Sequence, residues 1–185
     1  MNAFGKIVAI FVAVLLLFLC PIQYVAQKQD LLMQQHITMQ TTYFVDSIRN
    51  LGYVTRQMYE EYQKNIQMGA QRYEIEITQY HLQYVLNNGE MLEEDEWEEV
   101  PYSQQMSTFM KQYHCFYTED LLTVLYETEE KFYPFHQGDY ITVKVKEKTK
   151  SLAQRMQEMV LGTNPLQEQY VAIYGGMIRD EAYEP

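Results

Sequence analysis

The sequence predicts an α+β protein: a long N-terminal membrane-plus-stalk helix, then a small domain with a three- to four-stranded antiparallel or mixed sheet and short helices. Three observations support this fold class. Fourteen consecutive apolar residues fill Ile7–Cys20, no Gly or Pro occurs between Gln23 and Leu51, and segments beyond Gly52 alternate between strand-like and helix-like periods. We divide the 185 residues into a short cytoplasmic tail (1–6), a transmembrane anchor (7–26), an amphipathic helix continuing it (27–51), an α+β domain (52–178) and a polar tail (179–185).

The apolar segment has three interpretations. Ile7–Ala26 is about 20 residues, which is long enough to cross a bilayer core as a helix. A cleaved secretory signal would need a small residue where Tyr24 stands, and a lipoprotein signal would need small residues just before Cys20. A retained signal anchor with the short tail inside and the bulk of the chain outside fits best. Its lipid-facing residues include Ile7, Phe11, Leu15 and Phe18.

An amphipathic stripe follows the anchor without a linker. Ile37, Phe44, Ile48 and Leu51 recur near heptad spacing, and Gly52 is a plausible helix stop. The pattern predicts either one helix of over 40 residues, or a break near Pro21 and a second helix from about residue 31. In both cases the stripe must be covered, either by the chain's own domain or by neighbouring copies.

The first half of the domain begins with a helix that Thr55 caps and that ends near Gly69. Residues 73–78 alternate apolar and polar side chains, which predicts a half-buried strand, and the phase shift beyond them predicts a bulge or bend near Gln79. The acidic run at 90–99 lacks the ligand spacing of a calcium loop, so we interpret it as a solvated loop, with a divalent-cation site as the alternative.

The second half adds a short helix over 104–113 and another that begins with Thr118 as its N-cap. Residues 139–146 alternate strictly and form the clearest strand prediction. A helix over 152–160 and a last strand over 170–178 complete the domain. The pair Gly175-Gly176 inside that strand predicts a bulge or a close backbone approach.

Composition and motifs exclude several classes of function. A net charge of -11 argues against nucleic-acid binding. The four histidines include no i, i+4 pair, and the chain has neither a phosphate-binding loop nor a nucleophile elbow. His114 and Cys115 are neighbours but would need two further ligands to bind a metal. The Tyr- and Phe-rich context of Cys115 predicts a buried structural thiol rather than a nucleophile. We therefore predict no enzymatic activity, no metal and no cofactor.

Several short stretches, with the overall plan of the chain, carry a family resemblance. They are Phe4–Lys6 with the apolar run, Phe44–Arg49 ahead of Gly52, Thr55–Tyr59, Gly138–Tyr140 and Tyr174–Arg179. The chain resembles pilins and pseudopilins, in particular small single-span proteins of tight-adherence (Tad) type pilus systems in Gram-positive bacteria. Pilin precursors usually carry a Gly cleavage point and a Glu five residues into the apolar run. Gly5 is present here but position 10 is Ile, which favours an uncleaved minor or accessory subunit.

The leading hypothesis is a single-pass, extracytoplasmic structural subunit of a pilus-like or secretion assembly, located in the cell membrane with its C-terminal domain outside. Its partners would be the lipid bilayer and other pilin-like or envelope-assembly subunits, contacted through the N-terminal helix, and no nucleic acid. The alternative is an anchored ligand-binding or sensory domain with a pocket lined by Tyr140, Tyr170 and Tyr174. An envelope enzyme using the acidic residues is the weakest hypothesis, because nothing in the sequence places two carboxylates together.

Overall fold

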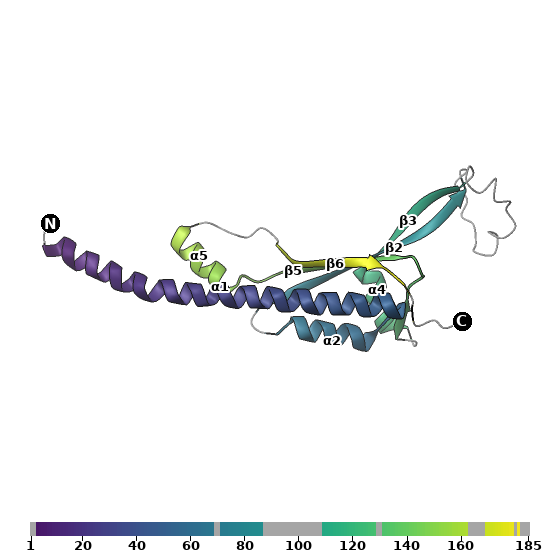
Figure 1. The fold of residues 1–185 in the computed structure, drawn as a ribbon, viewed down its shortest axis with the longest axis horizontal. Coiled ribbons are helices and arrows are strands. Elements are labelled where there is room, and N and C mark those ends of the chain that lie inside the picture. The colour runs from purple at the N-terminus through teal and green to yellow at the C-terminus, as the bar shows by residue number, and fades with distance from the viewer. Residues whose placement is uncertain are drawn as a thin grey trace.

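The computed structural model describes residues 3–68, 71–86, 109–128, 131–162, 169–179 and 181. Their fold is α+β, as the sequence predicts (Figure 1). The acidic run at 90–99 lies outside the described residues. In chain order the elements are α1 (Ala3–Leu51), β1 (Tyr53–Thr55), α2 (Arg56–Ile66), β2 (Tyr73–Leu86), β3 (Phe109–Tyr117), α4 (Thr118–Glu127), β4 (Phe132–Pro134), β5 (Tyr140–Glu147), α5 (Leu152–Leu161) and β6 (Tyr170–Met177).

The N-terminal helix is continuous. α1 has 49 residues, about 70 Å at the usual rise, and Pro21 lies inside it without ending it. Of the two predictions, one long helix is therefore confirmed, and the break near Pro21 does not occur. α1 ends as predicted at Gly52, which has a φ of 74° and donates its N–H to the carbonyl of Ile48 at 2.8 Å.

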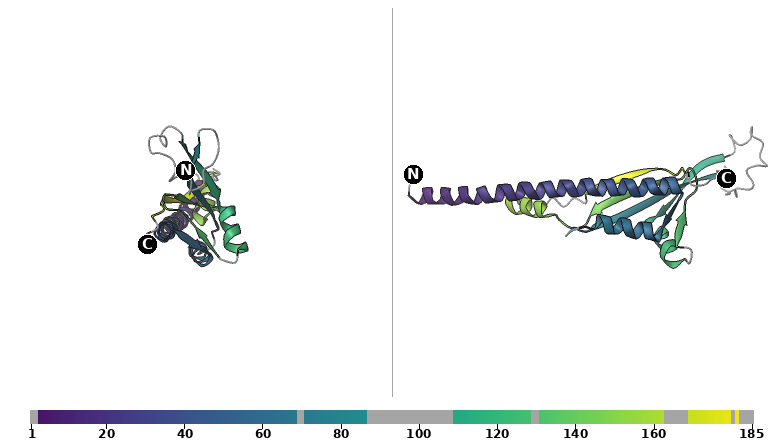
Figure 2. Two further views of the ribbon diagram at one scale, coloured as in Figure 1. Left: turned by 90° about the vertical axis from the view of Figure 1, so that its right-hand side faces the viewer. Right: turned by 60° about the horizontal axis from the view of Figure 1, so that its bottom comes forward.

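The strands of the described residues form two antiparallel sheets. The larger has four strands in the order β3-β2-β5-β6, and β1 pairs with β4 in a two-stranded sheet. The C-terminal half of α1 lies along the inner face of the large sheet, with α2 beside it (Figures 1 and 2). Inward-facing apolar residues of the central strands meet α1 there and are at most 1% exposed: Ile77, Ile141, Val143 and Val145.

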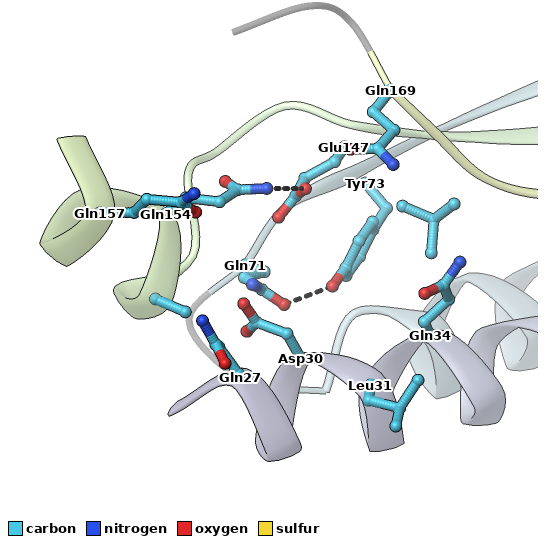
Figure 3. Close-up of a pocket in the computed structure, with 12 residues that line it drawn as sticks. Gln27, Asp30, Leu31, Gln34, Gln71, Tyr73, Glu147, Gln154, Gln157 and Gln169 are labelled. Atoms are coloured by element: carbon cyan, nitrogen blue, oxygen red, sulfur yellow. Dashed lines mark hydrogen bonds between the residues drawn. The ribbon is translucent and has the colours of Figure 1, made fainter. Parts of the chain in front are cut away.

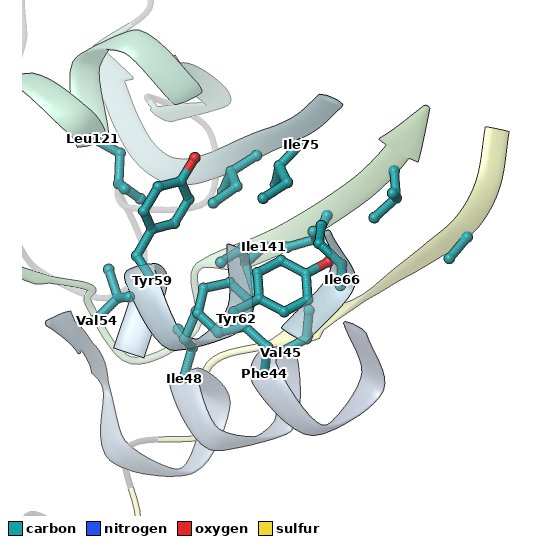
Figure 4. Close-up of a cluster of buried hydrophobic side chains, with 14 of the residues drawn as sticks. Phe44, Val45, Ile48, Val54, Tyr59, Tyr62, Ile66, Ile75, Leu121 and Ile141 are labelled. Carbon is teal, nitrogen blue, oxygen red and sulfur yellow. The ribbon is translucent and has the colours of Figure 1, made fainter. Parts of the chain in front are cut away.

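The predicted stripe on α1 is covered by the chain's own domain. Ile37, Phe44 and Ile48 are at most 3% exposed, and Leu51 is half-buried. The ring of Phe44 stacks on that of Tyr62 from α2, with 4.3 Å between centroids (Figure 4). Of the two covers that the sequence left open, the domain and not a neighbouring copy buries this face.

The sequence places most elements correctly. The side chain of Thr55 accepts a hydrogen bond from the N–H of Met58 and caps α2 as predicted. β5, α5 and β6 each lie within a residue of their predicted bounds. Thr118 does begin α4, but the N-cap is Tyr117, and the Thr118 hydroxyl instead contacts the backbone of Ile77.

The helix predicted over 104–113 is wrong in its described part. Phe109–Tyr117 forms β3, which pairs antiparallel with the outer half of β2 from Thr78 to Leu86. The local pattern favours a helix, but the hydrogen bonds between β2 and β3 outweigh that preference. They join segments about 30 residues apart and satisfy the backbone groups of both strands.

The sequence predicted a bulge or a bend near Gln79, and the pairing of β2 shows that no bulge lies there. β2 pairs with β5 and β3 without a register shift through Gln79, and the irregularity of the sheet lies between Val145 and Lys146. The inward face of β2 continues regularly but becomes polar. Gln79 is 4% exposed, and its amide donates to Asp139 at 2.5 Å and accepts from Tyr133 at 2.6 Å.

The glycine pair in β6 provides the predicted close approach. A Cβ on Gly175 would lie 2.5 Å from the backbone oxygen of Ile141, and one on Gly176 would lie 2.5 Å from Nε of Arg49. Arg49, in the last turn of α1, donates from Nε to the carbonyl of Met177 at 3.0 Å. The missing side chain of Gly176 therefore lets the end of α1 dock directly against the backbone of β6, and that of Gly175 makes room for the backbone of β5.

Candidate functional site

The first candidate surface is the N-terminal half of α1, which projects away from the domain (Figure 2). The predicted anchor residues Ile7, Phe11, Leu15 and Phe18 are between 44% and 68% exposed. Within the described residues, α1 is long and apolar enough to cross a membrane by length and composition, criteria that a signal sequence also meets. So large an apolar surface needs a cover that the domain does not supply.

The C-terminal half of α1 carries a second stripe that the sequence analysis missed. Leu32, Met39 and Tyr43 are 64%, 59% and 73% exposed, on the side of the helix that the domain leaves open. Their spacings of seven and four residues align them along one line of the helix. Extended towards the N-terminus in steps of seven, the same line passes through Val25, Phe18, Phe11 and Phe4, all at least 55% exposed.

α5 lies beside α1 at the boundary between its two halves (Figure 1). Among the described residues up to position 30, only Leu19, Gln23, Ala26 and Asp30 are buried or half-buried. These four share one helical face. Ser151, at the N-cap of α5, donates its hydroxyl to Asp30 at 2.5 Å. Away from α1, α5 presents Leu152 and Met159 to solvent, 59% and 87% exposed.

A polar cavity of about 290 Å³ opens between α1, α5 and the ends of β2 and β5 (Figure 3). Its wall is rich in glutamine side chains and holds two carboxylates, Asp30 and Glu147. Burial raises the pKa of Glu147, and the negative charge of Asp30 adds to this, while a hydrogen bond from Gln154 opposes it. Burial, with the same two carboxylates nearby, also raises the pKa of Tyr73 to about 12.

The three tyrosines of the predicted ligand pocket are divided between the two faces of the sheet. Tyr140 alternates with the buried Ile141 and so faces outward, and Tyr170 lies outward beside Lys144 and Glu76. Tyr174 pairs with the buried Val143 on the inner face, and its hydroxyl donates to Asp46 of α1 at 3.3 Å. The structure does not bring these three side chains together.

His114 and Cys115 are adjacent in β3, so their side chains point to opposite faces of the sheet. His114 and Cys115 are therefore not placed to bind the same metal ion. Cys115 is half-buried rather than buried, on the outer face opposite Tyr80.

A cluster that sequence reasoning missed lies at the polar end of the inner face. His81, His136 and Asp139 have possible ligand atoms within 4.8 Å of one another. His81 and Asp139 are separated by 58 residues, so no local motif contains them. The available signal was the break in apolar alternation at Gln79, which marks where the inward face becomes polar.

Comparison with known proteins gives no match: no family model, no curated protein and no solved structure matches the chain.

Proposed function

We propose that this chain is a membrane-anchored, extracytoplasmic structural subunit, a minor pseudopilin or accessory protein of a pilus-like or secretion assembly. The observation that carries the proposal is the division of α1 into two halves. One half is apolar on every side and uncovered, and the other half is built into the domain on one face while its opposite face carries Leu32, Met39 and Tyr43.

The bilayer is the cover proposed for the first half. Ile7–Ala26 spans about 30 Å as a helix, which matches the thickness of a hydrocarbon core. Gln27, Lys28 and Asp30 follow at once, so the polar boundary falls near the contact with α5. At that depth the exposed Leu152 and Met159 of α5 would rest in the membrane interface, as the apolar face of an interfacial helix does.

The outer stripe is the contact proposed for a partner subunit. Single exposed apolar residues are ordinary, but three aligned at heptad-like spacing on a helix present the seam of a helix pair. The stripe is continuous with the exposed line of the anchor, so one partner helix could follow it through the membrane and beyond. The stripe Ile37, Phe44, Ile48, Leu51 is already used by the domain and plays no part in this contact.

Cysteine crosslinking in the native membrane tests the proposal. Met39→Cys is introduced into the full chain after Cys20→Ser and Cys115→Ser, and a bifunctional thiol reagent is applied to intact cells. We expect a covalent adduct with another membrane-anchored subunit or a second copy of the chain, and labelling of Met39→Cys by a membrane-impermeant reagent.

Thr38→Cys is the matched control. Thr38 precedes Met39 and is also exposed, but it lies about 120° round the helix from the line of Leu32, Met39 and Tyr43. Equal adducts from both variants, or none from Met39→Cys, would contradict a helix seam. Labelling only after lysis would place the domain inside the cell and remove the extracytoplasmic assignment.

A second candidate function, an anchored sensory domain, is favoured by the cavity beside the membrane boundary. The glutamine amides of the cavity suit a small polar ligand. Such a ligand would contact both α1 and the domain, because both line the cavity. A thermal shift of the full chain in detergent with sugars or short peptides, lost on Gln154→Leu, would support this function over the structural one.

A further inference from the structure

Two histidines meet at one end of the inner sheet face, and a third lies on the same face of the neighbouring strand. His81 comes from β2 and His136 from the loop ahead of β5, and their ring centroids are 4.8 Å apart. His114 lies on β3 directly opposite His81 in the antiparallel ladder. Directly opposite residues share a face with their Cβ atoms about 5 Å apart, so His114 projects from the same face of the sheet as His81.

Asp139 fixes the orientation of the His81 ring through a hydrogen bond to Nδ1. The carboxylate is 2% exposed, and Oδ1 lies 2.7 Å from Nδ1 of His81. Its other oxygen accepts from the Gln79 amide at 2.5 Å and from the backbone N–H of His136 at 3.1 Å. A carboxylate on Nδ1 keeps the proton on that nitrogen, so Nε2 of His81 carries the lone pair, as in the carboxylate–histidine–metal arrangement.

The other two rings complete the site by side-chain rotation. The side chain of His136 is 62% exposed, and its Nδ1 lies 3.9 Å from Oδ2 of Asp139. Zn–N bonds of 2.0–2.1 Å in a tetrahedron need ligand nitrogens about 3.3 Å apart, closer than the 4.8 Å limit that holds for His81, His136 and Asp139, and His114 lies outside that group. His114 is also exposed, and its ring now rests against Phe116 at 4.7 Å, on the same face of β3.

We propose that His81, His114 and His136 bind one Zn²⁺ ion, with Asp139 as a positioning residue behind His81. Three neutral imidazoles suit zinc, and Cys115 does not contribute because it faces the other side of the sheet. The bound ion would tie the β2-β3 hairpin to the loop that enters β5. The proposal is independent of membrane anchoring, since all four residues belong to the domain.

Cobalt titration of the full chain in detergent micelles tests the proposal, using metal-free protein without a polyhistidine tag. We expect one Co²⁺ per chain with the visible absorption of low coordination number, displaced by one equivalent of Zn²⁺. Proton NMR should show three hyperfine-shifted, exchangeable ring N–H resonances, one for each ligand. His114→Ala and His136→Ala should each remove one resonance and weaken binding by about 100-fold or more.

Both variants change exposed side chains, so folding is preserved and the result is interpretable. His36→Ala is the matched control: its ring lies 3.1 Å from the carbonyl of Asn65, far along the chain from the cluster, and cobalt binding should be unchanged. Asp139→Asn should lower the affinity about 10- to 100-fold and shift the His81 N–H resonance, which a merely structural role would not do. Full cobalt affinity in the double His114→Ala, His136→Ala variant, or no specific binding by the unaltered chain, would overturn the proposal.

Discussion

The two halves of α1 are parts of one helix with opposite surroundings. Phe18 in the first half is 63% exposed, whereas Phe44 in the second is 3% exposed and stacked on Tyr62. Local helix formation is the same in both, so the difference comes from what lies beside the helix. The comparison teaches that the second half stabilises the domain, while the first half needs a cover from outside the chain.

Truncating matched phenylalanines gives the largest expected contrast. Phe44→Ala should lower the free energy of unfolding of the domain by about 3–5 kcal/mol, because it leaves a cavity under the Tyr62 ring. This corresponds to a fall in Tm of about 10 °C, measured on the full chain in detergent. Phe18→Ala should leave that transition unchanged, since Phe18 is 63% exposed and does not belong to the buried core of the described residues. Equal shifts for both variants would show that the two halves do not differ in this way.

Alkaline pH probes the covered half through Tyr62. Burial raises the pKa of Tyr62 to about 12, although its 2.8 Å hydrogen bond with Thr41 acts in the opposite direction. A tyrosine in the unfolded chain loses its proton near pH 10, so the folded state holds a proton that the unfolded state has released. The ionisation of Tyr62 should therefore lower the free energy of unfolding by about 2 kcal/mol between pH 10 and 12.

Tyr62→Phe should remove this part of the alkaline loss at a cost of about 1 kcal/mol at neutral pH from the lost hydrogen bond. The check is the free energy of unfolding in urea at pH 8 and at pH 11. Tyr43→Phe, on the exposed face of the same helix, is the control and should keep the full slope. A Tyr62→Phe slope equal to that of the unaltered chain would contradict burial of the Tyr62 hydroxyl.

The smallest expected effect lies at the junction of the halves, where Asp30 of α1 faces Glu147. Burial raises the pKa of Glu147, so its carboxyl keeps a proton to higher pH in the folded state than in the unfolded state. Stability is therefore lost as pH rises through that window, and the loss persists at neutral pH. Glu147→Gln should recover less than about 1 kcal/mol at pH 7 and nothing at pH 3, after allowance for solvent screening.

Thermal unfolding of Glu147→Gln at the two pH values measures this difference, with Glu61→Gln on the exposed face of α2 as the control. A stabilisation of the same size at pH 3 and pH 7 would mean that the charge of Glu147 is not responsible.

Sequence reasoning was most accurate where structure depends on neighbours in the chain. The apolar run and the absence of breakers predicted α1, and Thr55 and Gly162 bound their helices through local backbone geometry. Reasoning failed where distant segments pair. The first part of β3 was predicted to belong to a helix over 104–113, because apolar residues recur there at helical spacing. Its pairing with β2 makes it a strand.

The candidate sites divide in the same way. The exposed anchor residues follow from composition, but the cluster of His81, His136 and Asp139 has no spacing that a motif could recognise. Its residues meet because β2 and β5 are adjacent in the sheet and Gln79 links them through buried hydrogen bonds.

By itself, the sequence determined that a long helix with an apolar first half precedes a mixed α+β domain, because helix periodicity, caps and hydropathy act over a few residues. Only the tertiary structure decided which face of that helix the domain covers, which face with Leu32 and Met39 stays open, and which histidines meet. Those outcomes depend on pairing and packing between segments far apart in the chain, whose energies no local pattern contains.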